Sequence, residues 1–159
     1  MALLAALRRP RPAAARAVRR AALLSPMADY RFRAPRAPRA PPRTIDDPIC
    51  VPALLEWCCA LCRAHSGGEE NPIDADMSQF STHLELWVWT DASEYLRDGA
   101  RALVRRARRA GRRATLYENT RALHAGPVLC ALRSVPGLLD RDVRALARFL
   151  ARGAGLKML

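Results

Sequence analysis

The stretch HLELWVWTDASEYLRDG, residues 83–99, decides the expected fold, because it passes from the pattern of a strand to that of a helix. Bulky apolar and aromatic residues over 84–90 favour a β-strand. Since side chains alternate along a strand, Leu84, Leu86 and Val88 share one face, and Trp87 and Trp89 lie on the other. We therefore expect a strand covered on both faces, as in the middle of an α/β sheet.

An amphipathic helix is predicted over about 92–110, directly after this strand. Asp91 suits the N-cap position, and Glu94, three residues later, completes a capping-box pattern. Residues 113–118, RATLYE, predict a second strand. The strand, the helix and the next strand together form a βαβ unit with parallel strands.

The remaining segments complete one small α/β domain over residues 44–159. Apolar spacing predicts a helix over 48–65, a loop over 66–82, a third strand at 127–132 and a last helix at about 139–152. The expected order is α-β-α-β-β-α, with a short mixed sheet flanked by helices.

A disordered basic, proline-rich arm is expected over residues 1–43, which hold eleven Arg and one acid. Its second part, RFRAPRAPRAPPR at 31–43, carries four prolines and is typical of an extended linker. Residues 1–26 contain no acid, which fits a mitochondrial presequence. They also fit a plain basic arm, or an extension upstream of a true start at Met27.

Most of the net charge of +12 belongs to this arm, and the rest of the chain is polarised. Residues 44–98 carry a net charge of −9 and residues 99–159 carry +11. Two such halves can pack with complementary potentials, or the basic one can bind an acidic partner protein. Nucleic acid is a less favoured partner, because phosphate sites usually add Lys, Gly and aromatic residues. The candidate partner-binding residues lie along the predicted helix: Arg97, Arg101, Arg105, Arg108 and Arg109.

The cysteines give no cofactor or metal site by their spacing alone. The chain has five cysteines, which is an odd number, and no convincing secretory signal. Together these features indicate free thiols in a reducing compartment. Cys58, Cys59 and Cys62 lie near His65, but no second Cys-x-x-Cys completes a structural zinc site. Cys58 and Cys62 fall on the predicted buried stripe of the helix, where cysteine packs as a small apolar residue.

A small polar cluster is the only candidate for chemistry at the strand ends. Asp91 follows the first strand, Glu118 ends the second, and His124 lies in the next loop. The carboxyl edge of an open α/β sheet is where ligands bind. Without a glycine-rich phosphate loop or a nucleophile motif, however, we expect no catalytic residues and no enzyme activity.

The block ELWVWTDASEYLRDG, its Arg-rich helix and the strand ending TLYEN loosely resemble a small family of uncharacterised chordopoxvirus proteins. The resemblance covers about residues 48–152 and implies an intracellular viral protein without an assigned enzyme activity, so no catalytic residues are carried over from it. The sequence therefore predicts a cytoplasmic interaction protein, without a membrane span, that uses its Arg-rich helix. The alternative is a basic protein of the mitochondrial matrix that binds RNA or the ribosome.

Overall fold

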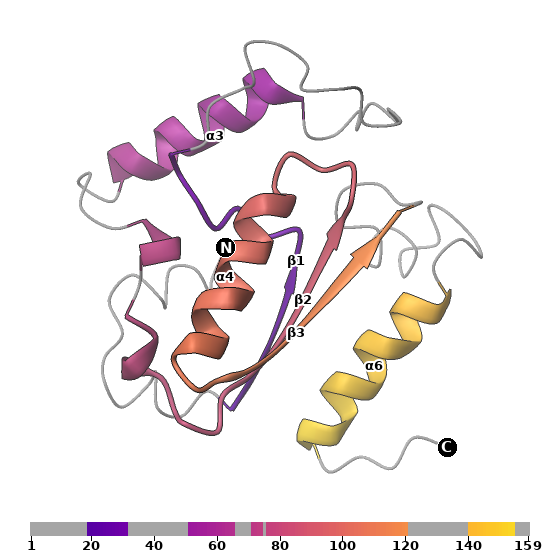
Figure 1. Ribbon diagram of the computed structural model, residues 1–159. Coiled ribbons are helices and arrows are strands. Elements are labelled where there is room, and N and C mark those ends of the chain that lie inside the picture. Colours follow the sequence, from indigo (N-terminus) through magenta and orange to yellow (C-terminus); the bar gives the residue numbers. More distant parts are fainter. Residues whose placement is uncertain (1–18, 32–50, 66–70, 75, 121–139, 155–159) are drawn as a thin grey trace.

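The computed structural model describes residues 19–31, 51–65, 71–74, 76–120 and 140–154 (Figure 1). Within these ranges the chain forms β1 (Arg20–Leu24), α3 (Pro52–His65), two 3-10 helices η1 (Pro72–Asp74) and η2 (Met77–Gln79), β2 (Glu85–Asp91), α4 (Arg97–Arg109), β3 (Arg113–Asn119) and α6 (Asp140–Ala154). Strands and helices follow one another along the chain, and the described strands are parallel. The predicted small α/β domain is confirmed.

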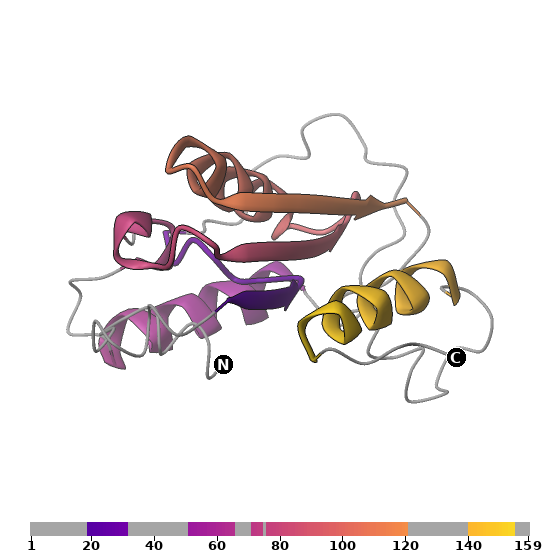
Figure 2. The same ribbon diagram turned by 90° about the horizontal axis from the view of Figure 1, so that it is seen from below.

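The sheet has the order β1-β2-β3, with β2 in the middle (Figure 2). α4 connects β2 to β3, which confirms the predicted βαβ unit. In register across the three strands lie Arg20, Glu85 and Arg113, and the Glu85 carboxylate is 3.2 Å from Arg20 and 3.5 Å from Arg113. Opposite charges directly across neighbouring strands favour this register over a shifted one. The predicted strand 127–132 lies outside the described residues.

β2 is covered on both faces, as its alternating pattern predicts. Leu86 and Val88 face α4 and pack in one cluster with Leu103. On the other face Trp87 and Trp89 pack against α6, in a cluster that contains Phe149 and Ala145. Figure 1 shows α4 and α6 on opposite sides of the sheet. The two tryptophans are 3% and 0% exposed, so they belong to the core.

β1 corrects the expectation that residues 1–43 form an arm without structure. Arg20–Leu24 pairs with β2, and Ala21 and Leu23 are buried. The chain that follows is also packed, because Ala28 and Tyr30 are 1% and 3% exposed. The sequence RAALL hides this strand, since Ala and Leu favour helices when neither a partner strand nor burial decides.

α4 begins later than predicted, at Arg97 instead of about residue 92. Its N-cap residue is Leu96, which makes no side-chain capping hydrogen bond. The prediction that Asp91 caps this helix is therefore wrong, since Asp91 is the last residue of β2. The helix still buries the predicted face, which includes Leu103 and Val104.

α3 and α6 confirm two predicted helices, but α3 buries a different face from the one expected. In α3 the buried residues are Leu55 and Cys59, at 5% and 0% exposure, while Cys58 and Cys62 are half-buried. The expectation that Cys58 and Cys62 are the buried cysteines is thus corrected. In α6, Ala145 and Phe149 are buried, whereas the apolar Leu150 is 51% exposed. Periodicity defines an apolar stripe, whereas the neighbouring elements decide which part of it is covered.

Candidate interaction surface

The outer side of α4 carries the arginines that the sequence singled out. Arg105, Arg108 and Arg109 are exposed. They are spaced i, i+3 and i+4, so they are neighbours on the helix surface. Arg108 Nε donates a hydrogen bond to the Ala114 carbonyl at 2.8 Å, which holds this side chain near the start of β3. Within the described residues, Arg105 and Arg109 form no ion pair and no side-chain hydrogen bond.

The other two predicted arginines are engaged within the domain. Arg101 binds Glu118 on β3 through two hydrogen bonds, at 2.9 Å from Nε and 2.6 Å from Nη2. These bonds raise the pKa of the Arg101 guanidinium. Arg97 Nη1 donates to the Ala92 carbonyl at 2.7 Å. The predicted set of five therefore divides into two half-buried arginines, Arg97 and Arg101, and three exposed ones, of which Arg108 also binds the backbone of β3.

Arg106, outside the predicted set, connects α4 to the acidic segment before β2. Its Nη2 donates to the Asp74 carbonyl at 2.7 Å, and its Nη1 is 3.9 Å from the Asp74 carboxylate. The same carboxylate is 3.3 Å from Arg31. This contact pairs a residue of the acidic half of the sequence, 44–98, with one of the basic half, 99–159, as packing of the two halves would require.

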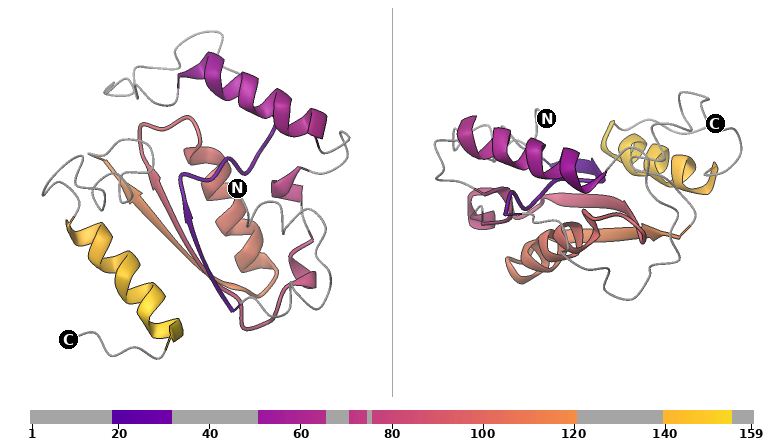
Figure 3. Two further views of the ribbon diagram at one scale, coloured as in Figure 1. Left: turned by 180° about the vertical axis from the view of Figure 1, so that it is seen from behind. Right: turned by 90° about the horizontal axis from the view of Figure 1, so that it is seen from above.

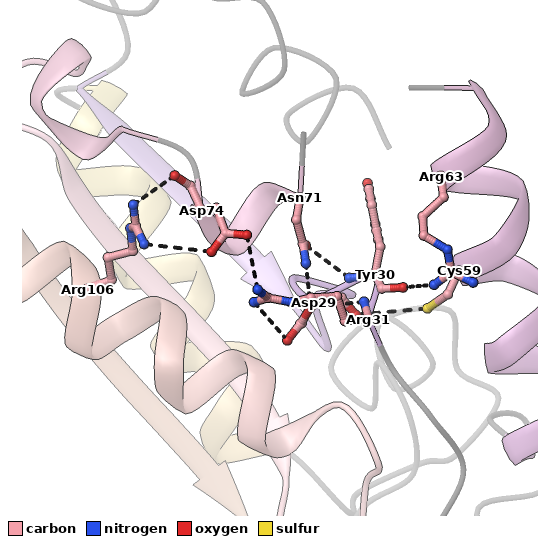
Figure 4. A network of polar contacts seen from close by, with 8 residues as sticks. All are labelled: Asp29, Tyr30, Arg31, Cys59, Arg63, Asn71, Asp74 and Arg106. Atoms are coloured by element: carbon pink, nitrogen blue, oxygen red, sulfur yellow. Dashed lines mark hydrogen bonds and ion pairs between the residues drawn. The ribbon is translucent and has the colours of Figure 1, made fainter. Parts of the chain in front are cut away.

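Asp29 is the centre of a polar network that joins the chain after β1 to α3 and η1 (Figure 4). Arg31 contributes its backbone N–H at 3.0 Å and its Nε at 2.9 Å, and Asn71 donates to the same carboxylate. Burial alone would raise the pKa of Asp29, but the hydrogen bonds from Arg31 and Asn71 outweigh it and lower that pKa. Arg63 of α3 donates to the Tyr30 carbonyl in the same network.

Glu94 occupies the carboxyl edge of the sheet, between β1 and the loop after β2. Its carboxylate accepts hydrogen bonds from Ser25 Oγ at 2.5 Å, from Thr90 Oγ1 at 2.7 Å and from the Asp91 N–H at 3.1 Å. The side chain is 4% exposed. Ser25 has a φ of 44°, which is uncommon for a residue other than glycine. Glu94 thus serves to close the loop rather than to cap the helix.

Asp91 and Glu118 do not come together as the predicted polar cluster requires. In the sheet register Asp91 lies beside Asn119, and Glu118 lies beside Thr90. Because side chains alternate along a strand, the two carboxylates point to opposite faces. Asp91 accepts hydrogen bonds from Ser93, whereas Glu118 binds Arg101. His124 lies outside the described residues.

Asp142 is a buried carboxylate that the sequence analysis did not single out. It lies on α6, is 8% exposed and accepts hydrogen bonds from Trp89 Nε1 at 2.8 Å and Asn119 Nδ2 at 2.7 Å. It therefore joins α6 to both β2 and β3. Only the contact between elements far apart in the chain reveals this role, so local patterns gave no signal.

α6 carries a second arginine surface. Its arginines contribute to the net charge of +11 of residues 99–159, but the charge alone did not show that they lie together on one helix. These arginines recur at helical spacing on the side that faces away from the sheet, and all of them are exposed: Arg141, Arg144, Arg148 and Arg152. The sequence contained a signal for this surface, because the four arginines are spaced i, i+3, i+7 and i+11, as residues on one side of a helix are. Because α4 and α6 lie on opposite faces of the sheet, the two arginine surfaces are separate.

Cys59 packs inside the domain, 3.5 Å from Met27 Sδ and 3.9 Å from the Asp29 carbonyl. Burial raises the pKa of its thiol. In the part of the chain that the structure describes, no group of three or more His, Cys, Asp or Glu could hold a metal ion. The described cysteines Cys58, Cys59 and Cys62 are not joined by disulfide bonds.

Comparisons with protein-family models, curated proteins and solved structures yield no match to this chain. Among the described residues, no helix is long and apolar enough to cross a membrane.

Proposed function

We propose that the protein is a non-enzymatic interaction protein that binds an acidic partner protein through Arg105, Arg108 and Arg109 of α4. The observation that carries this proposal is that the arginines of α4 differ in whether an acidic side chain lies beside them. Arg101 is neutralised by Glu118, while Arg105 and Arg109 are exposed and have no acid beside them among the described residues. Arginine binds carboxylates through a planar fork of donors, so a cluster of three suits an acidic surface.

Polar side chains at the carboxyl edge of the sheet support the non-enzymatic part of the proposal. Glu94 and Asp142 are buried carboxylates, and each accepts hydrogen bonds that hold neighbouring segments together. The hydrogen bonds of both carboxylates therefore stabilise the fold. Asp91 likewise accepts from Ser93 in the turn after β2.

Binding of a polyglutamate peptide tests the proposal with a defined acidic probe. The variant Arg105→Glu/Arg109→Glu should lose roughly tenfold or more in affinity, because two attractions become repulsions. Affinity of the unchanged protein should also fall as salt is added. Arg148→Glu/Arg152→Glu on α6 carries the same change of charge and is the matched control. Equal losses in the two variants would show that only the net charge matters and would contradict a site on α4.

RNA binding is the second candidate function, favoured by the exposed arginine stripe of α6. Single-stranded polyuridine distinguishes the candidates. If α6 is the site, Arg148→Glu/Arg152→Glu weakens RNA binding and leaves polyglutamate binding unchanged.

The cytoplasmic or mitochondrial location and the viral origin expected from the chordopoxvirus resemblance stay predictions. A fluorescent reporter fused after residue 31 would test the location, since β1 then stays within the fused segment.

A further inference from the structure

α3 has an unusual distribution of side chains. The helix lies on the outside of the described domain, beyond α4 (Figure 3). Its exposed residues with described side chains are all apolar: Ala53, Leu54, Trp57, Ala60, Leu61 and Ala64. Its two charged residues, Glu56 and Arg63, are half-buried instead. Solvated helix faces are normally polar, so this face has the composition of a contact surface.

The large side chains on this face are substantially exposed. Trp57 is 60% exposed, Leu54 43% and Leu61 39%. By contrast, Trp87 and Trp89 are almost fully buried. Isolated exposed apolar residues are ordinary, but three of them together on one helix mark an interaction site.

The spacing of these residues matches the seam of a coiled coil. Leu54 and Leu61 occupy the a positions of a heptad, and Trp57 and Ala64 occupy the d positions. The flanking g positions hold Ala53 and Ala60, whose small side chains permit a close approach of two helices. Leu55 and Cys59, which pack into the domain, fall at the b and f positions on the opposite side. The seam is therefore directed away from the protein's own core.

We propose that a second copy of this chain covers the seam, with the two α3 helices antiparallel about a twofold axis. In antiparallel coiled coils an a position faces a d position. About a centre at residue 59, Leu54 of one copy faces Ala64 of the other, and Trp57 faces Leu61 of the other. Each large residue at the ends meets a small one, and the surface is complementary to itself, as a twofold interface requires.

Charge and area define what kind of dimer this is. No charged residue lies at the seam, because Glu56 and Arg63 both occupy the outer c position. An acidic or basic partner therefore gains nothing here, in contrast to α4. Stable dimers bury about 800 Å² per partner, and the exposed parts of one short helix offer roughly half of that. The dimer is accordingly weak, with a dissociation constant on the order of 10–100 µM.

Sedimentation velocity of the full chain, at concentrations on both sides of that range, tests the proposal. The unchanged protein should pass from monomer to dimer, and Leu54→Gln/Leu61→Gln should remain a monomer. Both substituted side chains are exposed, so the fold should survive, as circular dichroism would verify. Leu150→Gln, at a 51% exposed leucine of α6, is the matched control and should still dimerise. A monomer throughout, or a dimer that survives the double substitution, would overturn the proposal.

Cross-linking tests the antiparallel arrangement separately. Cys58 occupies the e position near the centre of the seam, so two copies bring their Cys58 thiols together beside the twofold axis. Diamide accepts two electrons and two protons as the two thiols form one disulfide bond. The cross-linked dimer should vanish in Cys58→Ser and persist in Cys62→Ser, since position 62 faces the domain. No cross-link in the unchanged protein, or one that survives Cys58→Ser, would exclude this arrangement.

Trp57 distinguishes a second copy from a lipid surface. Because the other two tryptophans are buried, a change in emission reports mainly on Trp57. The proposal expects a blue shift with protein concentration and none on adding phosphatidylcholine vesicles at a dilution where the protein is monomeric. A shift that appears only with vesicles would overturn it and assign the seam to a membrane surface.

Discussion

At the scale of single residues, Glu94 shows most clearly how position changes the meaning of a side chain. Its spacing from Asp91 is that of a capping box, and Glu94 does accept the backbone N–H of Asp91. The helix, however, begins three residues after Glu94, at Arg97. Its carboxylate also accepts from Ser25, 69 residues away, so this residue ties β1 to the β2–α4 loop.

Replacing Glu94 by Gln should lower the free energy of unfolding by about 2 kcal/mol, because an amide group places donors where the site supplies donors. Denaturation by urea measures the change. Glu118→Gln, which removes one partner of a surface ion pair, is the comparison and should cost less than about 1 kcal/mol. Equal costs in the two variants would show that the buried position of Glu94 is unimportant.

Asp29 should make stability depend on acid. Its pKa is lowered in the folded chain, so the stabilisation is present above the ordinary carboxyl pKa and is lost as the pH falls through the lowered value. Asp29→Asn should remove this contribution and flatten the decline in unfolding free energy below about pH 4. Since the side chain is 36% exposed, the effect at neutral pH stays below about 1 kcal/mol.

Acid titration of thermal unfolding measures that slope. Asp98→Asn is the control, because the Asp98 side chain is 80% exposed on α4. If the two substitutions flatten the acid decline equally, the network around Asp29 does not provide the dependence.

At the scale of elements, local patterns predicted what local forces decide. The alternation of Leu86, Trp87, Val88 and Trp89 was enough to define β2 and its two covered faces. The predicted start of α4 was wrong because the residues of a capping box, Asp91 and Glu94, also form hydrogen bonds in turns. β1 was missed because Ala and Leu become a strand here only through pairing with β2.

Candidate sites were less predictable than elements, for the same physical reason. The outward position of Arg105 follows from helix periodicity, whereas the pairing of Arg101 with Glu118 joins residues 17 positions apart. Likewise Asp142 meets Trp89 from another element, 53 residues away. Contacts between elements depend on topology, which the pattern of one element does not contain.

α6 docks on the sheet through a polar contact as well as an apolar one. Asp142→Ala should lower the free energy of unfolding by about 2–3 kcal/mol, because the Trp89 and Asn119 donors lose their acceptor in a buried place. Trp89 emission should shift as its surroundings change. Arg141→Ala, at the exposed neighbouring position, is the control and should stay within about 0.5 kcal/mol. Unchanged stability in Asp142→Ala would show that the apolar contact of Phe149 alone holds the helix.

At the scale of the whole molecule, β1 extends the described fold well before the expected boundary. The expected boundary at residue 44 separated a basic arm from a nearly neutral domain, but the structure takes residues 20–24 into the sheet. Ser25 continues this attachment, since its N–H donates to the Trp89 carbonyl at 2.8 Å. Processing after residue 26, or a start at Met27, would therefore remove an edge strand from the sheet.

Two truncated chains test this boundary. The chain 19–159 keeps β1 and should unfold at nearly the same temperature as the full chain. The chain 27–159 exposes one edge of β2 and leaves Glu94 without the Ser25 hydroxyl, so it should unfold well below that temperature or aggregate. Thermal unfolding followed by circular dichroism measures both. If 27–159 matches 19–159, β1 adds nothing to the stability of the domain, and translation from Met27 would give a fully stable protein.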